Sequence, residues 1–350
     1  MSQPTDRAPD ADRPLTVDVH AHKECAPVRT RMRTVEVEAG RLPLAVGSEL
    51  TRSVNAEMLE TVRPRMDDVD LRLRDMDAAG VDMQVISITP YQMYYWLPGA
   101  QGADVSAEIN DDLAATVGGH PTRFAGLGTV PLQDPAAAAS ELRRCVDTLG
   151  FAGVTIGTNV GGEDLSSPRF WDVFEAAEDL DAALFMHSSG YTCPDRLEDH
   201  YFMNVLGHPF EGSVALAHLI FDGVLERFPA LKLVVAHGGG YLAAYPGRLD
   251  HAYHARADVG PSLPHPPSTY LRRVHVDSTV FDHRQLEFLV GMYGADKVLL
   301  GTDYPYDMGD PGGPAMISGS ALPADEIAAV RGGNAVRLFG LDPALKAGAR

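Results

Sequence analysis

The feature that most restricts the fold is a set of eight short apolar segments, rich in β-branched residues, with helical patterns between most of them. Near-continuous apolar strands that alternate with helices are typical of a parallel sheet buried on both faces. Eight such units predict an α/β fold, the (β/α)8 or TIM barrel. The expected strands span residues 15–20, 81–88, 123–130, 151–158, 182–187, 231–237, 274–279 and 297–303.

Helix boundary signals fit the same fold. Asp134 and Pro135 form an N-cap and first-turn pair before an alanine-rich helix, and Gly80 and Gly150 are placed to end helices. The 350 residues, 45% of them hydrophobic and 22% charged, suit one barrel with extra loops. We therefore expect a single domain over residues 14–350 and a disordered tail over residues 1–13.

Two connections are too long for simple loops. Residues 23–66 contain the segment TVEVEAGRLPLAV, whose alternating halves flank Ala39 and Gly40, and this predicts a small hairpin after the first strand. Residues 188–230 contain EGSVALAHLIFDGVLERF, which predicts a helical insertion after the fifth strand. Long insertions at the carboxyl ends of barrel strands usually shape or cover a binding site.

Charge and cysteine content limit the partners. The net charge of −19 disfavours nucleic acid and membrane surfaces and leaves a small molecule as the expected partner. No apolar run approaches the roughly 18 residues that span a bilayer, and the first residues lack the apolar core of a secretory signal. Cys25, Cys145 and Cys193 form no CxxC pair, so a reducing, cytoplasmic location is expected.

Metal-binding side chains stand at the ends of the predicted strands. His20 and His22 end the first strand, and their spacing places both on one face. His187 ends the fifth strand, His237 the sixth and Asp303 the eighth. The chain has 13 histidines, so four at strand ends are unlike a random scatter. Because these ends share the rim where barrel enzymes hold their chemistry, they predict a common metal site.

The donor atoms also indicate the metal. Imidazole and carboxylate ligands suit zinc, with manganese as the alternative, and an open coordination position would bind water or a substrate oxygen. A pair of ions would need a bridging carboxylate or a modified lysine on a middle strand, and the fourth strand, FAGVTIGT, offers neither. None of the four lysines, which are Lys23, Lys232, Lys297 and Lys346, lies at the end of that strand. We expect one divalent ion.

The motifs VDVHAH, LFMHSSG, VVAHGGGYLAAYPGR and LLGTDYPYDMG, in this order, resemble the amidohydrolase superfamily. Together with DMDAAGVDMQVISITP, VDSTVFDHRQLEFLV and GGNAVRLFG, they are most similar to its aminocarboxymuconate-semialdehyde decarboxylase branch, from about Val17 to Gly340. The resemblance implies a mononuclear metal-dependent carboxy-lyase that acts on a small unsaturated or aromatic carboxylic acid. The pair His20-x-His22, in place of the Glu-x-His of several aromatic-acid decarboxylases, favours the muconate-semialdehyde-like branch or related hydratases.

The resemblance also implies roles for single residues. It makes His20, His22, His187 and Asp303 the metal ligands. It makes His237 the acid/base residue beside a metal-bound water that Asp303 helps to orient. A fifth ligand position is the alternative for His237.

Substrate-binding residues are less determined. The resemblance implies that Arg248 reaches the site of a neighbouring subunit, and hence a homodimer, whereas a surface arginine at a helix end is the alternative. Arg52 and Arg63 compete to bind the substrate carboxylate. The aromatic residues of YQMYYWLPG could wall a pocket for a planar ring or could form an aromatic core under a loop; they are Tyr91, Tyr94, Tyr95 and Trp96.

Other histidines and other functions stay open at this point. We expect His208 and His218, in the insertion, to serve packing or hydrogen bonding, and His251 and His254 to lie on a solvated helix face. The rival functions are hydrolysis of an amide, lactone or ester, hydration of an unsaturated diacid, and binding without catalysis. The intact set of five strand-end residues argues against the last of these.

Overall fold

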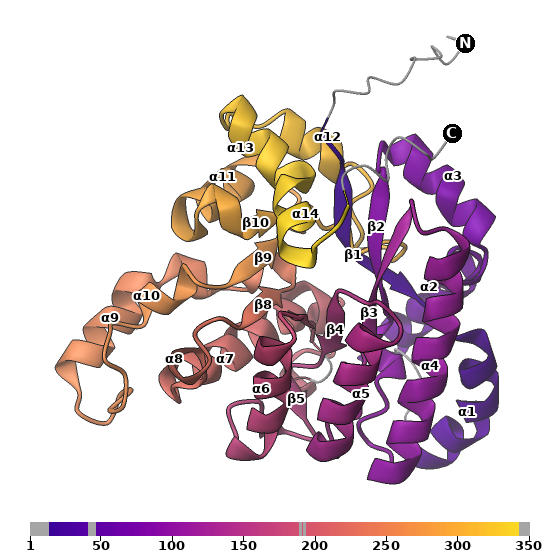
Figure 1. The fold of residues 1–350 in the computed structure, drawn as a ribbon, viewed down its shortest axis with the longest axis horizontal. Coiled ribbons are helices and arrows are strands. Elements are labelled where there is room, and N and C mark those ends of the chain that lie inside the picture. Colours follow the sequence, from indigo (N-terminus) through magenta and orange to yellow (C-terminus); the bar gives the residue numbers. More distant parts are fainter. Residues whose placement is uncertain (1–13, 41–46, 189–190, 192–193, 343–350) are drawn as a thin grey trace.

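The computed structural model describes residues 14–40, 47–188, 191 and 194–342, and it confirms the α/β barrel (Figure 1). Eight parallel strands form one sheet in the order β1-β2-β3-β4-β7-β8-β9-β10. These strands are β1 Val17–Lys23, β2 Met83–Ile88, β3 Phe124–Thr129, β4 Gly153–Ile156, β7 Ala183–Met186, β8 Lys232–Val235, β9 His275–Asp277 and β10 Val298–Leu299. Each matches one of the eight predicted runs.

Backbone bonds between β1 and the end of β10 close the sheet. The Val19 amide donates to the Leu300 carbonyl at 2.8 Å. The His22 amide donates to the Tyr304 carbonyl at 2.7 Å, beside a parallel bridge between Ala21 and Tyr304. Because closure brings the first and last strands together, the ends of β1 and β10 become neighbours at the mouth of the barrel.

A bulge in β1 decides which side chains face the interior. The register of β1 on β2 shifts between Asp18 and Ala21. Val19 belongs to the interior apolar cluster with Phe185, and the His20 ring also lies against Phe185, with centroids 5.1 Å apart. The extra residue of the bulge lets two consecutive side chains point inward. Alternation then resumes, so His22 joins His20 at the mouth, with ring centroids 5.0 Å apart.

Helices surround the barrel (Figure 1). They are α1 Ala26–Ala39, α2 Glu49–Asp67, α3 Val69–Ala79, α4 Gly99–Gly119, α5 Pro135–Asp147, α6 Trp171–Asp179, α7 His208–Phe221, α8 Val224–Arg227, α9 Pro246–Ala255, α10 Ser268–Leu271, α11 His283–Tyr293, α12 Gly313–Ser318, α13 Ala324–Ala328 and α14 Asn334–Phe339. A short ribbon of β5 Asn159–Val160 and β6 Glu163–Asp164 follows β4. Two of the expected caps are present: the Asp134 side chain accepts from the Ala137 amide, and Gly80 ends α3 at a φ of 71°. The third differs, because α5 ends at Asp147 with Thr148 as its C-cap, before Gly150.

The hairpin predicted within residues 23–66 is wrong in its first arm. The Val-Glu alternation there lies in α1, which ends at Gly40 in the left-handed conformation. Val28, Met32 and Glu36 are its buried residues, and their spacing of four is the helical repeat. The contacts of this face outweigh the strand preference of the valines. The second arm, residues 41–46, lies outside the described residues.

The stretch predicted to be helical within residues 188–230 does form helices, since α7 and α8 follow β7. Residues 1–13, the predicted disordered tail, lie outside the described residues. Among the helices that the structure describes, none combines the length and apolar character needed to cross a membrane.

Candidate metal centre

Four side chains from three strand ends meet at the mouth of the barrel. His20 and His22 come from β1, His187 follows β7 and Asp303 follows β10. Their candidate ligand atoms all lie within 4.8 Å of one another. The sequence therefore predicted correctly which distant residues come together here.

The spacing of these atoms fits a single divalent ion. The Nε2 atoms of His20 and His22 are 3.1 Å apart, and Asp303 Oδ1 lies 3.3 Å from the first and 3.1 Å from the second. Donor atoms bound to tetrahedral zinc at about 2.0–2.1 Å are about 3.4 Å apart. Asp303 Oδ1 is also a buried oxygen without a hydrogen-bond partner among the described residues. A cation would satisfy both this oxygen and the facing imidazole lone pairs.

A buried carboxylate orients the first imidazole. Asp277, at the end of β9, lies 2.6 Å from Nδ1 of His20 through its Oδ2 atom. This contact keeps the proton of the neutral ring on Nδ1 and leaves Nε2 free to bind a metal. The other oxygen of Asp277 accepts from the Gly238 amide at 2.8 Å. Asp277 was not predicted as a site residue, although its position in VHVDST is also close to a strand end.

The acidic groups make this site attract positive charge. Burial lowers the pKa of His20, but the carboxylates of Asp303 and Asp277 outweigh it and raise that pKa to about 9. For Asp303, burial acts to raise the pKa, and the facing imidazoles of His20 and His22 hold it well below its usual range. A bound divalent ion would take the place of the proton at this position.

His237 lies beside the four metal-competent side chains, and it lines a cavity together with two of them, His187 and Asp303. Its Nε2 atom is 3.9 Å from Asp303 Oδ2, and its ring centroid is 4.8 Å from that of His187. Both His237 and Asp303 have a φ of 56°, in the left-handed region that ordinary residues avoid. Such backbone costs on the order of 1–3 kcal/mol per residue and is found where function fixes a side-chain direction.

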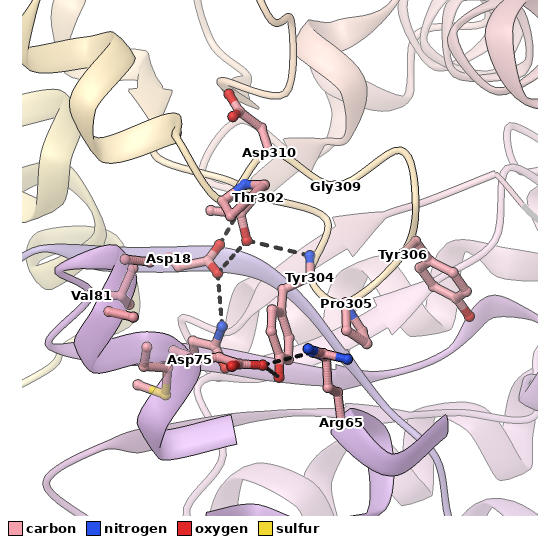
Figure 2. Close-up of a pocket in the computed structure, with 15 residues that line it drawn as sticks. Asp18, Arg65, Asp75, Val81, Thr302, Tyr304, Pro305, Tyr306, Gly309 and Asp310 are labelled. Atoms are coloured by element: carbon pink, nitrogen blue, oxygen red, sulfur yellow. Dashed lines mark hydrogen bonds and ion pairs between the residues drawn. The ribbon is translucent and has the colours of Figure 1, made fainter. Parts of the chain in front are cut away.

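A buried network behind the site ties β1 to the loop that carries Asp303. Asp18 Oδ1 accepts from the Thr302 amide at 3.0 Å, and Asp18 Oδ2 accepts from the Thr302 hydroxyl at 2.7 Å (Figure 2). Gln84 Nε2 donates to Asp18 at 3.0 Å and its carbonyl accepts from Arg72 at 3.0 Å. Arg72 also donates to the His22 carbonyl. The network therefore supports both ligand-bearing segments.

Figure 2 shows the outer side of this network, where a cavity of about 380 Å³ lies between α3 and the loop that follows β10. There Tyr304 donates to Asp75 at 2.9 Å, and Asp75 is paired with Arg65 at 2.8 Å. These contacts hold the loop against α3. The candidate metal ligands do not line this cavity.

A smaller cavity of about 160 Å³ opens directly on the candidate metal site. Its lining side chains include four tyrosines and further polar groups: Tyr91, Tyr191, Tyr201, Tyr306, Ser188, Asn204 and His208, together with His187, His237 and Asp303. Sequence reasoning missed most of these residues. Five of them (Ser188, Tyr191, Tyr201, Asn204 and His208) come from the segment after β7, where no periodic pattern marks a direction. His208, expected in packing or hydrogen bonding, has its Nε2 atom 2.9 Å from the Tyr191 hydroxyl.

The predicted substrate-binding aromatic residues lie elsewhere. Tyr94 is 3% exposed and packs with Trp96 in an apolar cluster beside α1 and α4 that includes Val28 and Ile109. Neither lines the 160 Å³ cavity, so the structure places them as the aromatic core under a loop. Tyr91, which was also predicted to wall a pocket, does line this cavity.

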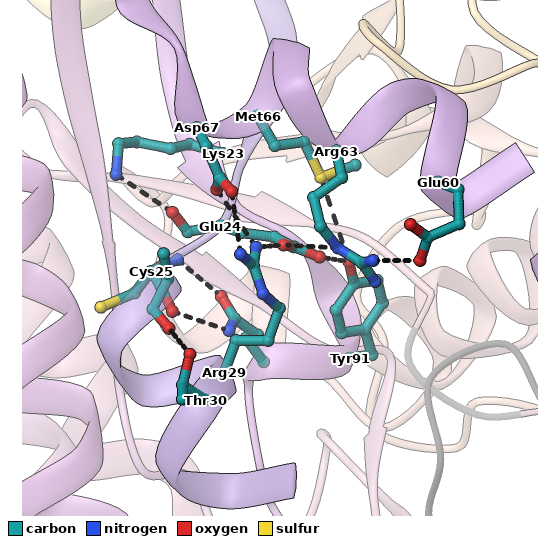
Figure 3. Close-up of polar contacts among 12 residues, drawn as sticks. Lys23, Glu24, Cys25, Arg29, Thr30, Glu60, Arg63, Met66, Asp67 and Tyr91 are labelled. Atoms are coloured by element: carbon teal, nitrogen blue, oxygen red, sulfur yellow. Dashed lines mark hydrogen bonds and ion pairs between the residues drawn. The ribbon is translucent and has the colours of Figure 1, made fainter.

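The arginine candidates differ in their surroundings. Arg52 is exposed and donates to the Gly47 carbonyl within its own segment. Figure 3 shows Arg63 and Arg29 converging on the buried carboxylate of Glu24, which also accepts from the cavity residue Tyr91. The Arg63 Nε atom lies 3.8 Å from Glu24. Arg63 is therefore one residue removed from the cavity.

Arg248 lies in the first turn of α9 and is exposed. Its backbone amide donates to the Tyr245 carbonyl at 3.0 Å. The side chain is absent from the described linings of both cavities. Within one copy of the chain, Arg248 thus stands apart from the candidate metal centre.

Comparisons with known proteins agree with this architecture. The amidohydrolase family model matches residues 17–341. The 2-amino-3-carboxymuconate-6-semialdehyde decarboxylase of Dictyostelium discoideum is 38% identical over 279 residues, which cover 79% of this chain and 77% of that protein.

Solved structures share the fold over nearly the whole chain. The 5-carboxyvanillate decarboxylase of Sphingomonas paucimobilis has a TM-score of 0.83 at 29% identity, covering 94% of this chain and 99% of that one. The dihydroxybenzoic acid decarboxylase of Polaromonas sp. JS666, with bound manganese and the inhibitor 2-nitroresorcinol, has a TM-score of 0.78 at 23% identity, covering 94% and 97%. The chain is therefore a member of the amidohydrolase family, in its aminocarboxymuconate-semialdehyde decarboxylase-like branch.

Proposed function

We propose that the protein is a divalent-metal-dependent, non-oxidative decarboxylase of a small aromatic or unsaturated carboxylic acid. The observation that carries the proposal is the grouping of four metal-competent side chains, two of which, His187 and Asp303, line a tyrosine-lined cavity together with His237. The decarboxylase activities named for its relatives at 38% and 29% identity support the choice of reaction.

His20, His22, His187 and Asp303 would hold the metal. A divalent ion bound there supplies Lewis-acid stabilisation of negative charge on the substrate oxygens. Three imidazoles and one carboxylate favour zinc, and manganese, which the Polaromonas structure contains, is the alternative.

His237 would act as the acid that starts the reaction. Its Nε2 atom faces the cavity beside Asp303, so a proton held there can pass to the substrate carbon that bears the carboxylate. The bond from that carbon to the carboxylate then breaks and its electron pair returns to the conjugated system. Carbon dioxide leaves, and the imidazole regains a proton from solvent. The left-handed backbone of His237 and Asp303 fixes both side chains in this arrangement.

The cavity limits the substrate. Its volume of about 160 Å³ is close to the roughly 150 Å³ of an apolar cavity that holds benzene. It therefore suits one ring or a short conjugated chain, with the tyrosine hydroxyls available to polar substituents. A neighbouring cavity of about 430 Å³, which His237 and Asp303 also line, leaves room for larger substituents. Of the two competing arginines, Arg63 is the better candidate for the substrate carboxylate, because its neighbour Tyr91 lines the cavity and Arg52 lies outside.

We also infer a cytoplasmic homodimer. Several large apolar side chains are exposed, among them Tyr241 at 39%, Tyr245 at 58% and Phe281 at 51% exposure. Tyr245 directly precedes α9 in the sequence, and Tyr241 and Phe281 line a further cavity together with His237. A partner subunit would cover them and could receive Arg248. Light scattering on the purified protein tests this state, and a monomer at working concentration would refute it.

The reaction class is tested with metal-loaded protein and a panel of hydroxylated benzoic acids and unsaturated diacids. Carbon dioxide and ultraviolet absorbance are followed together. Release of one carbon dioxide per acid consumed, lost on chelation and restored by zinc or manganese, is the expected result. Cleavage of lactones or amides with no carbon dioxide from any acid would replace the proposal by hydrolysis.

A further inference from the structure

A larger cavity adjoins the one that opens on the candidate metal site. Its volume is about 430 Å³, against about 160 Å³ for the first, and we call them the outer and the inner cavity, respectively. Asn204, His237 and Asp303 line both, so the two cavities adjoin at these three side chains. The inner cavity holds little more than one ring, and the proposed reaction gives the outer cavity no part.

Apolar side chains from separate segments dominate the lining of the outer cavity. Val205 follows β7, Phe281 precedes α11, Phe288 lies on α11, and Met308 follows β10. Val205 is 43% exposed, Phe281 51% and Phe288 38%. Large apolar side chains that line a hollow and stay this exposed are typical of a site that buries an apolar group.

The backbone holds Phe281 against this cavity. Its φ is 60°, in the left-handed region that residues with a β-carbon avoid. The next residue, Asp282, caps α11 by accepting from the amides of Arg284 at 2.9 Å and Gln285 at 3.1 Å. This cap fixes the turn in which Phe281 lies. Backbone of this kind persists only where the surrounding structure determines it, and it is concentrated at binding and active sites.

The outer cavity offers no partner for a negative charge. Among its lining residues that the structure describes, none is a lysine or an arginine, and Asp303 and His237 lie where the two cavities adjoin. The Thr279 hydroxyl donates to a backbone carbonyl at 3.2 Å, and the Tyr241 hydroxyl does so at 3.4 Å. A carboxylate placed there would lose its water without gaining a cation. The cavity therefore suits an uncharged group.

We propose that the outer cavity binds an uncharged, apolar arm of the substrate. The preferred substrate is then an aromatic or unsaturated monocarboxylic acid with an apolar substituent, and a dicarboxylic acid of the same length is disfavoured. Val205, Phe281 and Phe288 determine this specificity. A partner subunit that covers Phe281 would close the outer cavity over the arm. The inference rests on the proposed function for the reaction, whereas binding of the arm is measurable without turnover.

The direct test is calorimetric titration of the zinc-loaded protein with a series of benzoic acids. The series is benzoic acid itself and its methyl, propyl and pentyl derivatives, substituted at each ring position in turn. At the position that directs the chain into the outer cavity, affinity should rise about two- to fourfold for each added methylene. A chain of the same length that ends in a carboxylate should give no gain. Chromatography after each titration measures any acid consumed.

Variants separate the outer cavity from the rest of the surface. Val205→Asp places a charge in the cavity and should abolish the gain from the alkyl chain, while the affinity for benzoic acid stays within about twofold of wild type. Val54→Asp is the matched control, because Val54 lies on α2, is 49% exposed and lines none of the described cavities. Ala244→Trp fills the outer cavity without a charge and should also abolish the gain.

Equal affinity along the alkyl series in wild type, or a gain that survives in Val205→Asp and Ala244→Trp, would overturn the proposal. A gain from the terminal carboxylate as large as that from the alkyl chain would refute the uncharged class. If Val205→Asp does not fold by circular dichroism, Ala244→Trp carries the test.

The inference and the proposed function fail separately. An alkyl gain without carbon dioxide release from any acid would count against the decarboxylase and support the outer cavity as a binding site. Carbon dioxide release from unsubstituted acids, with no gain in affinity or in kcat/KM for any alkyl derivative, would support the decarboxylase and contradict the inference.

Discussion

Replacement of Asp277 by asparagine tests how the metal site is held. The carboxylate lies 2.6 Å from His20 Nδ1, and both side chains are fully buried. The amide can still accept from Gly238, but its NH2 group would then face His20 Nδ1 and donate to it. The proton of the imidazole would move to Nε2, the nitrogen that must be bare to bind a metal.

The size of the effect follows from this contact. A hydrogen bond to a charged group contributes about 1.5–3 kcal/mol, and 1.4 kcal/mol is tenfold in an equilibrium constant. Asp277→Asn should therefore raise the zinc dissociation constant by roughly 10- to 150-fold. Competition with a chromophoric chelator measures it on metal-free protein. Asp258→Asn is the control, because that carboxylate is exposed and paired only with Arg256 among the described residues. Equal zinc affinity in Asp277→Asn and wild type would refute this account of His20.

Three further predictions concern catalysis, stability and pH. His237→Asn should keep one tightly bound metal ion, because His237 is not among the four proposed ligands, and its carbon dioxide release should fall by about 10²- to 10⁴-fold. Elemental analysis measures the metal content, and loss of the metal in this variant would make His237 a ligand instead. Arg72→Met should lower the free energy of unfolding by about 2–4 kcal/mol, because Gln84 Oε1 and the His22 carbonyl lose a buried charged donor. Urea unfolding measures this change, and a value below about 0.5 kcal/mol would contradict the role of the network. Burial, with a smaller effect of Lys297, lowers the pKa of His275 from 6.5 to about 4; because the fold favours the neutral ring, its contribution to stability is complete above pH 6.5 and is lost as the pH falls towards 4. When the pH is lowered from 6.5 to 4, the melting temperature of His275→Gln should therefore fall by less than that of wild type. Equal falls in the two proteins would contradict this role of His275.

The barrel was predictable because its signal is repeated and local. Each strand is a short apolar run, and burial on both faces of a parallel sheet makes such runs continuous. The strand-end position of His20, His187, His237 and Asp303 then located the site, since closure of the sheet brings all strand ends to one rim. Spacing alone placed His20 and His22 on the same face, and the structure confirms it.

The remaining features depend on contacts between distant segments. The bulge in β1, which turns both Val19 and His20 inward, leaves no local mark in VDVHAH. The cavity walls come partly from the insertion after β7, where Tyr191, Tyr201 and Asn204 follow no period. The Val-Glu alternation of residues 34–38 favours a strand, but buried helical contacts of α1 decide otherwise. Tertiary packing thus decided the details that local sequence patterns could not.

The most direct test of the central claim is anomalous diffraction at the zinc edge from crystals that contain one equivalent of zinc. We expect one peak, about 2.0–2.2 Å from Nε2 of His20, Nε2 of His22, a ring nitrogen of His187 and Oδ1 of Asp303. A peak that lies away from these four atoms, or a protein that binds no zinc at one equivalent, would contradict it.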